Sequence, residues 1–211
     1  ALAMPGTAQA TPQLGDLGVK QSMSVKASNG ESLEGKDLRA IQLATYTAAS
    51  VDGNTIVGYD LTTNTALASD ITAAAKAAGA TDTNLTVNGK NDPMVWVVKN
   101  LTDSRSDPWS GKLRNFCNSL AKQTNFAKQD GTAVSTLSQD KATMSTGNVL
   151  VPGIYAIVDR TPATTTLSSG TAIKTTASIM MMNGTAVNGV NQLRTAGGTT
   201  LTLGQVIYKV S

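Results

Sequence analysis

The densest β-strand signal in the sequence is Val149-Leu150-Val151-Pro152-Gly153-Ile154-Tyr155-Ala156-Ile157-Val158-Asp159. Its β-branched and aromatic residues favour an extended backbone, and Pro152-Gly153 marks the point at which the strand begins. From Ile154 onward, alternate side chains point to opposite faces of a strand, and both sets are largely apolar or aromatic. The stretch therefore predicts a central strand of a sheet that is covered on both faces.

Further strand signals precede this stretch in the first third of the chain. Residues 22–26 alternate polar and apolar side chains, and an Asn29-Gly30 turn follows them. An extended-favouring run at 38–51 is followed by the turn residues Asp52-Gly53-Asn54 and a second run at 55–59. This arrangement predicts a β-hairpin.

β-strand character returns after the Asp130-Gly131 turn. Besides residues 149–159, the segments 171–182 and 199–210 are predicted strands, with turns at Asn183-Gly184 and Gly197-Gly198. Residues 161–170 form a predicted loop rich in Thr and Ser.

The middle of the chain has helical patterns instead. Residues 66–79 are rich in alanine, with Gly79 as the expected stop. Asp92-Pro93 suits a helix start, while the valines at 95, 97 and 98 also suit a strand, and we favour a helix. Asp107-Pro108 opens another predicted helix that runs to about Thr124. Its apolar residues recur at three- and four-residue steps: Trp109, Leu113, Phe116, Cys117 and Leu120.

Strands at both ends with helices between them predict one mainly β domain with a helical insertion at about residues 66–125. Neither β half has enough strands to close a core alone. The chain of 211 residues, 40% of them hydrophobic, is long enough to bury such a core.

Composition and charge argue against nucleic-acid binding. Only 15% of the residues are charged, the net charge is +3, and the positive residues are scattered without a basic run. No nucleic-acid footprint is present, so no nucleic-acid partner is expected. The abundance of Thr, Ser, Asn, Gly and Ala is common in extracellular β-rich proteins.

Cysteine and histidine usage narrows the chemistry further. Cys117 is the single cysteine, so it makes no internal disulfide and is most simply a core thiol. Because histidine is absent, Ser-His and Cys-His hydrolases are excluded. The sequence shows no metal cluster and no phosphate loop either, so no cofactor is expected. The remaining Ser, Thr, Lys and carboxylate residues form no recognisable catalytic motif, so we expect no enzyme and no catalytic residues.

The first ten residues predict a signal-peptide remnant. They combine apolar residues, a Pro5-Gly6 break and small residues at Ala8 and Ala10 in an A-x-A pattern. The alternative is a flexible end. No apolar run reaches the roughly 18 to 20 residues that cross a bilayer.

Two clusters are better explained by local structure than by binding. The segment Asp103-Ser104-Arg105-Ser106-Asp107 departs from metal-loop spacing and is expected to form a helix entry, so no metal site is predicted. The three methionines at 180–182 cannot share one face of a strand, so core filling plus one exposed thioether is expected rather than a partner-binding patch.

Lysines require separate attention because an extracellular protein without disulfides can be locked by a lysine–asparagine amide bond. Such a bond needs an uncharged amine and a carboxyl group buried in an apolar setting. Lysines that lie in or beside predicted strands are Lys20, Lys26, Lys174 and Lys209. No asparagine is identifiably opposite any of them, so ordinary surface lysines are expected.

The combined pattern resembles a known family. The residues that support the resemblance are the 41–46 strand with its Asp52-Gly53 turn, the 109–116 helix, the Pro152-Gly153-Ile154-Tyr155 strand and the closing segment 203–209. They look like the N-terminal domain of sortase-assembled pilus (fimbrial) backbone subunits of Gram-positive bacteria, which are LPXTG wall-anchored surface proteins. The resemblance covers residues 22–209.

This resemblance implies an Ig-like β-sandwich at residues 11–211, a fragment of a longer chain, secreted and displayed on the cell wall or pilus surface. Its expected function is that of a structural subunit domain, mediating stacking and adhesion, with neighbouring pilin subunits and sortase as partners. In the family, sortase joins a lysine of a Tyr-Pro-Lys motif to the next subunit. The nearest match is Tyr208-Lys209, which lacks the proline, so Lys209 is the candidate intersubunit isopeptide lysine.

The alternative is an adhesin domain of a wall-anchored protein that binds a host glycoprotein, matrix or carbohydrate. The loops at 161–170 and 183–198 are the places where such a site is expected, since loops on a rigid sandwich commonly hold binding residues.

Overall fold

A computed structural model of the chain describes residues 11–82, 85–87, 90–101, 111–163, 165–172, 179–195 and 198–208. The fold is mainly β. The strands are β1 (Ser24–Ala27), β2 (Leu38–Asp52), β3 (Thr55–Thr63), β4 (Thr86–Val87), β5 (Lys90–Asn91), β6 (Thr132–Val134), β7 (Thr136–Leu137), β8 (Thr143–Ser145), β9 (Gly153–Asp159), β10 (Ile179–Gly184), β11 (Gln192–Arg194), β12 (Thr200–Thr202) and β13 (Gln205–Tyr208). The helices are α1 (Ala68–Ala77), α2 (Pro93–Asn100), α3 (Lys112–Ala121) and α4 (Thr124–Ala127).

Two mixed sheets form a sandwich-like arrangement. The larger sheet has the order β10-β9-β2-β3-β11-β12, and β6 also pairs with β2. The smaller sheet has the order β13-β1-β8-β7. Both sheets are mixed because β11 runs parallel to β3 and β13 runs parallel to β1.

Strand β9 lies between two hydrophobic cores, as the sequence predicted. All of its residues are buried. Ile154, Ala156 and Val158 belong to the core that the helices complete, whereas Tyr155 and Ile157 belong to the core shared with the smaller sheet. The alternation of side chains along one strand therefore builds both cores.

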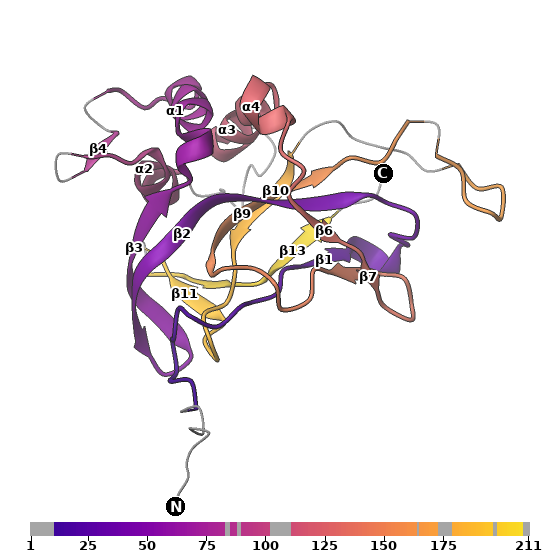
Figure 1. Ribbon diagram of the computed structural model, residues 1–211, viewed down its shortest axis with the longest axis horizontal. Helices are drawn as coiled ribbons and strands as arrows, with labels where there is room; N and C mark the ends of the chain where they lie inside the picture. Colours follow the sequence, from indigo (N-terminus) through magenta and orange to yellow (C-terminus); the bar gives the residue numbers. More distant parts are fainter. Residues whose placement is uncertain are drawn as a thin grey trace, which may run out of the picture.

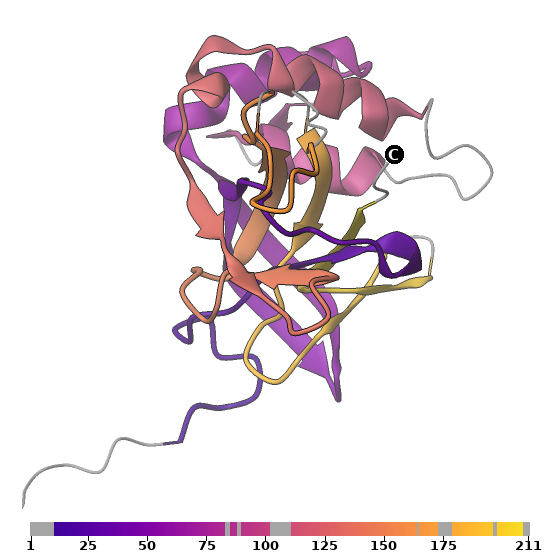
Figure 2. The same cartoon turned by 90° about the vertical axis from the view of Figure 1, so that its right-hand side faces the viewer.

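The helices pack on one face of the larger sheet. They gather at one end of the molecule, above β2 and β3 in Figure 1 and across the top of Figure 2. Their buried residues, among them Ile71, Met94 and Phe116, join the core that contains Ile154. After Asp92-Pro93 a helix was predicted in preference to a strand, and helix α2 confirms it. The Asp92 side chain caps this helix by accepting from the Val95 N–H.

The predicted hairpin is also confirmed. Strands β2 and β3 pair antiparallel up to Asp52 and Thr55, and Gly53 in the turn has φ 59°. Where β9 pairs with β2 at Thr45, glycine is required at position 153 by space: a Cβ on Gly153 would collide with the Ala44 carbonyl oxygen. The Pro-Gly start of β9 thus allows close backbone approach at a bulge in β2.

The C-terminal third differs from the prediction at the Asn183-Gly184 turn and in the last predicted strand, among other places. Asn183-Gly184 was predicted to be a turn but ends strand β10, because the Asn183 amide donates to the Thr202 and Gln205 carbonyls and fixes the extended chain there. The predicted strand at 199–210 is two strands, β12 and β13, which join different sheets on either side of Gly204 (φ 82°).

The structure also tests the predictions for Cys117, for the methionines and for the loop at 183–198. Cys117 is a buried thiol in the helical core, as predicted. Met181 and Met182 pack against opposite cores, in agreement with the alternation argument. The predicted loop at 183–198 contains strand β11, so that expectation was partly wrong. Residues 1–10, the segment 103–107 and the start of the helix at Asp107-Pro108 lie outside the described residues.

Candidate functional site

A buried ion pair joins the entry of β2 to the exit of β9. The Lys36 Nζ lies 3.1 Å from the Asp159 Oδ2, and the two side chains are 4% and 0% exposed. Lys36 comes two residues before β2, and Asp159 is the last residue of β9. These strands are neighbours in the larger sheet, so the pairing of Leu38 with Asp159 brings the two charges together.

The second oxygen of Asp159 is held by the residues that follow it. Asp159 Oδ1 accepts hydrogen bonds from the Thr161 N–H and the Thr161 hydroxyl. The Thr161 hydroxyl oxygen in turn accepts from the Asp37 N–H at 2.7 Å. Each carboxylate oxygen therefore has a hydrogen-bond donor: the Lys36 ammonium on Oδ2, and the Thr161 N–H and hydroxyl on Oδ1.

An aromatic ring from the smaller sheet completes the site. The Lys36 Nζ lies 5.4 Å from the centre of the Tyr208 ring, within the range of a cation–π interaction. Tyr208 is the last residue of β13 and is buried. The lysine therefore contacts both sheets, and we call Lys36, Asp159, Thr161 and Tyr208 the lysine clamp.

The lysine clamp suits a structural role. Burying two opposite charges is offset only when they are paired and hydrogen-bonded, as here, and removal of one partner is strongly destabilising. The clamp therefore fixes one relative position of β2, β9 and β13.

Sequence reasoning did not single out Lys36. Of the lysines that it did consider, Lys20 and Lys26 are exposed, as expected of surface residues, and Lys174 and Lys209 lie outside the described residues. Lys36 and Asp159 are 123 positions apart, and nothing local distinguishes Lys36 from an exposed lysine. Lys36-Asp37 directly precedes a strand that the sequence did predict, but that position alone does not indicate burial.

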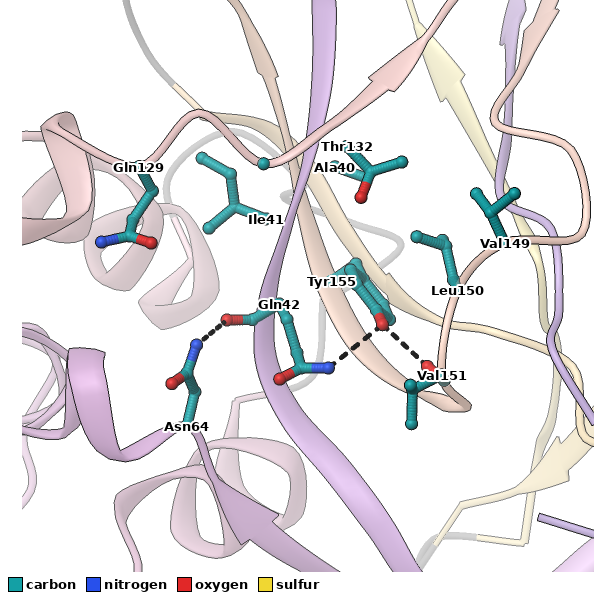
Figure 3. A pocket seen from close by; sticks show the side chains of 11 residues that line it. Ala40, Ile41, Gln42, Asn64, Gln129, Thr132, Val149, Leu150, Val151 and Tyr155 are labelled. Atoms are coloured by element: carbon teal, nitrogen blue, oxygen red, sulfur yellow. Dashed lines mark hydrogen bonds between the residues drawn. The ribbon is translucent and has the colours of Figure 1, made fainter. Parts of the chain in front are cut away.

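A pocket of about 290 Å³ lies elsewhere on the larger sheet, beside the part of β2 between its pairings with β6 and β3 (Figure 3). Its lining residues are uncharged and come from four segments of the chain: Ala40, Ile41, Gln42, Asn64, Gln129, Gly131, Thr132, Val149, Leu150, Val151 and Tyr155. Two of them, Val149 and Val151, are exposed apolar side chains, 55% and 38% accessible.

Hydrogen bonds fix the polar groups of this neutral pocket. The Tyr155 hydroxyl donates to the Val151 carbonyl at 2.7 Å and accepts from the Gln42 amide at 3.2 Å, as Figure 3 shows. The Asn64 amide donates to the Gln42 carbonyl at 2.9 Å. Burial raises the pKa of Tyr155, and the hydrogen bond from Gln42 partly opposes that shift. The pocket thus offers neutral amides and hydroxyls beside aliphatic side chains.

The pocket does not involve the loops at 161–170 and 183–198, where the sequence suggested a binding site. Among the described residues, no group of three or more His, Cys, Asp or Glu side chains is arranged to hold a metal ion. None of the helices in the described part of the chain is both long and apolar enough to cross a membrane.

Comparison of the chain with protein-family models, with curated proteins and with solved structures found no match in any of the three.

Proposed function

We propose that this chain is a structural domain of a pilus (fimbrial) subunit that sortase joins covalently to its neighbours on the wall of a Gram-positive bacterium. In this proposal the two sheets are an Ig-like sandwich, the helices at about 66–125 are an insertion, and the domain has no catalysis of its own. The resemblance of the sequence and the composition typical of extracellular β-rich proteins support it.

The observation that supports the proposal most directly is the lysine clamp. A domain without disulfides that serves as a building block needs another means to hold its sheets in one arrangement, and the buried Lys36–Asp159 pair against Tyr208 supplies one. Lys209, the candidate acceptor of the intersubunit bond, follows Tyr208 directly in the sequence.

The test is transpeptidation by a pilus-type sortase. The purified chain is incubated with the sortase and a peptide that ends in an LPXTG signal, and the product is mapped by mass spectrometry. We expect the peptide on Lys209, loss of the product in Lys209→Ala, and an unchanged product in Lys26→Ala, whose lysine is an exposed residue of β1. Attachment to a different lysine would refute the assignment of Lys209, and no attachment would count against the pilus proposal.

The neutral pocket favours a second candidate, an adhesin domain that binds a host carbohydrate or glycoprotein. Ligand sites combine apolar walls with a few fixed polar groups, and uncharged amides and hydroxyls suit hydroxyl groups of a neutral sugar. Titration with neutral oligosaccharides, followed by NMR, tests this candidate. Shifts confined to residues around Gln42 and abolished in Gln42→Ala would support it, and shifts unchanged in that variant would refute this location.

A further inference from the structure

Three Asn-Gly pairs lie in the described part of the chain: Asn29-Gly30, Asn183-Gly184 and Asn188-Gly189. They share one local chemistry, because glycine has no side chain to shield its backbone nitrogen from the preceding asparagine. Their surroundings differ. We propose that Asn29 is a site of spontaneous deamidation and that the fold protects Asn183 and Asn188 from the same reaction. This inference does not depend on the proposed function.

The reaction is balanced by water alone. The Gly30 nitrogen attacks the Asn29 Cγ and forms a new N–Cγ bond, the Cγ–Nδ2 bond breaks, and the amide nitrogen leaves as ammonia with the proton from Gly30. Water then opens the resulting succinimide at either carbonyl. The products are aspartate and isoaspartate at position 29, and both add one negative charge.

Asn29 lies where the chain can adopt the geometry of attack. Asn29 and Gly30 are both exposed, and within the described residues the Asn29 side chain makes no hydrogen bond. A Cβ on Gly30 would meet no atom within 4 Å. The turn is closed by one long backbone hydrogen bond, from the Glu31 N–H to the Ser28 carbonyl at 3.4 Å. Rotation about the Asn29 backbone therefore disrupts little structure.

Asn183, in contrast to Asn29, is restrained by hydrogen bonds. Its Nδ2 donates to the Thr202 and Gln205 carbonyls, each at 2.9 Å, so the group that must leave is bonded twice. The Gly184 N–H donates to the Asn183 Oδ1 at 2.8 Å, so the proton that the nitrogen must lose before it attacks is already hydrogen-bonded within the protein. Gly184 is buried in the ladder with β9. Attack would require the end of β10 to separate from the sheet.

Asn188 is also restrained, although it lies nearer the surface. Its Nδ2 donates to the Gln13 carbonyl at 2.8 Å, and its own carbonyl accepts from the Gly15 N–H at 2.9 Å. The Val187–Val190 bridge closes the turn with backbone bonds of 2.9 and 2.6 Å. The turn must lose several of these bonds before the attack geometry is reached, and this slows the reaction at Asn188.

The test compares the three sites within one molecule, folded and unfolded. The chain is incubated at mildly alkaline pH in buffer and, in parallel, in urea, and tryptic peptides are then analysed by mass spectrometry. Residues 27–36 report on Asn29, and fragment ions of residues 175–194 separate Asn183 from Asn188. In the folded chain we expect Asn29 to react at close to its unfolded rate and the other two to react at least about tenfold more slowly than theirs.

The matched control is Asn29→Gln, in which closure of a larger ring is slow, so the signal in residues 27–36 should disappear. Isoaspartate at position 29 is the expected marker of the succinimide route. The inference is overturned if folding suppresses Asn29 as strongly as Asn183, if Asn183 or Asn188 reacts first in the folded chain, or if position 29 yields aspartate without isoaspartate.

Discussion

Replacing Lys36 by methionine is expected to destabilise the protein by about 3 kcal/mol, the lower end of the range for breaking a buried ion pair. The change leaves the fully buried Asp159 carboxylate without its cationic partner. Its other oxygen keeps the two hydrogen bonds from Thr161, which is why the lower end applies. Loss of the cation–π contact with Tyr208 contributes to the same effect, since such contacts are worth about 1 kcal/mol.

Urea unfolding followed by circular dichroism measures this loss as a lower midpoint at an unchanged slope. A double-mutant cycle with Asp159→Asn isolates the pair, because removing both charges leaves no unpaired buried ion, and we expect a coupling energy of about 2 kcal/mol or more. The control is Lys26→Met on the exposed face of β1, with a change within about 0.5 kcal/mol. Additive effects of the two clamp substitutions, or a Lys36→Met loss as small as that of the control, would refute the reasoning.

Gly184→Ala should destabilise the protein by about 1–3 kcal/mol in urea unfolding, since the new Cβ would lie 2.6 Å from the Tyr46 hydroxyl. Combining it with Tyr46→Phe, which removes that hydroxyl, should recover part of the lost stability. Gly153→Ala should destabilise more than Gly184→Ala in the same assay, because its Cβ would collide with backbone rather than a side chain. Burial raises the pKa of Tyr46, Tyr59 and Tyr155 above the unfolded value of about 10. The stabilisation from these protonated phenols should therefore be fully present below about pH 10, and the free energy of unfolding should fall as the pH rises further. Phenolate absorbance that rises at the pH expected for free tyrosine while the protein stays folded would contradict this prediction.

The lysine clamp is expected to be an ion pair rather than an amide crosslink. The three groups known to bond the Asp159 carboxylate, from Lys36 and Thr161, all donate hydrogen bonds to it. The intact mass should therefore equal the mass of the unlinked chain. A mass lower by one water, mapped to the peptides that contain Lys36 and Asp159, would show an amide bond between them.

Local patterns predicted the long strands and the main helices, but several short strands were missed and, apart from the β2–β3 hairpin, the strand pairings did not follow from the sequence. Strand β9 and the β2–β3 hairpin followed from alternation and turn residues, because those signals act between neighbours in the sequence. The separation of β12 from β13 was missed because both segments favour extended backbone, and only the bend at Gly204 assigns them to different sheets. Asn183-Gly184 has the composition of a turn, yet tertiary hydrogen bonds of its side chain keep it extended.

The candidate sites were harder to predict for the same reason. The lysine clamp joins residues from the start of β2, the end of β9 and the end of β13. These residues meet because of the strand register, which could not be predicted from the sequence. The pocket depends on where the ladder of β2 passes from β6 to β3, which is again a matter of register. Its uncharged residues show no motif in the sequence.

The parallel pairing of β1 with β13 has a mechanical consequence. The register runs from Ser24 opposite Gln205 to Ala27 opposite Tyr208, so both strands point the same way. A pulling force applied through the segment before β1 and the segment after β13 would slide the strands along each other, and all the interstrand bonds would be strained at once. Antiparallel strands pulled from one shared end would instead separate bond by bond at lower force. With Tyr208 also against Lys36, this pairing is the point at which the protein would resist extension.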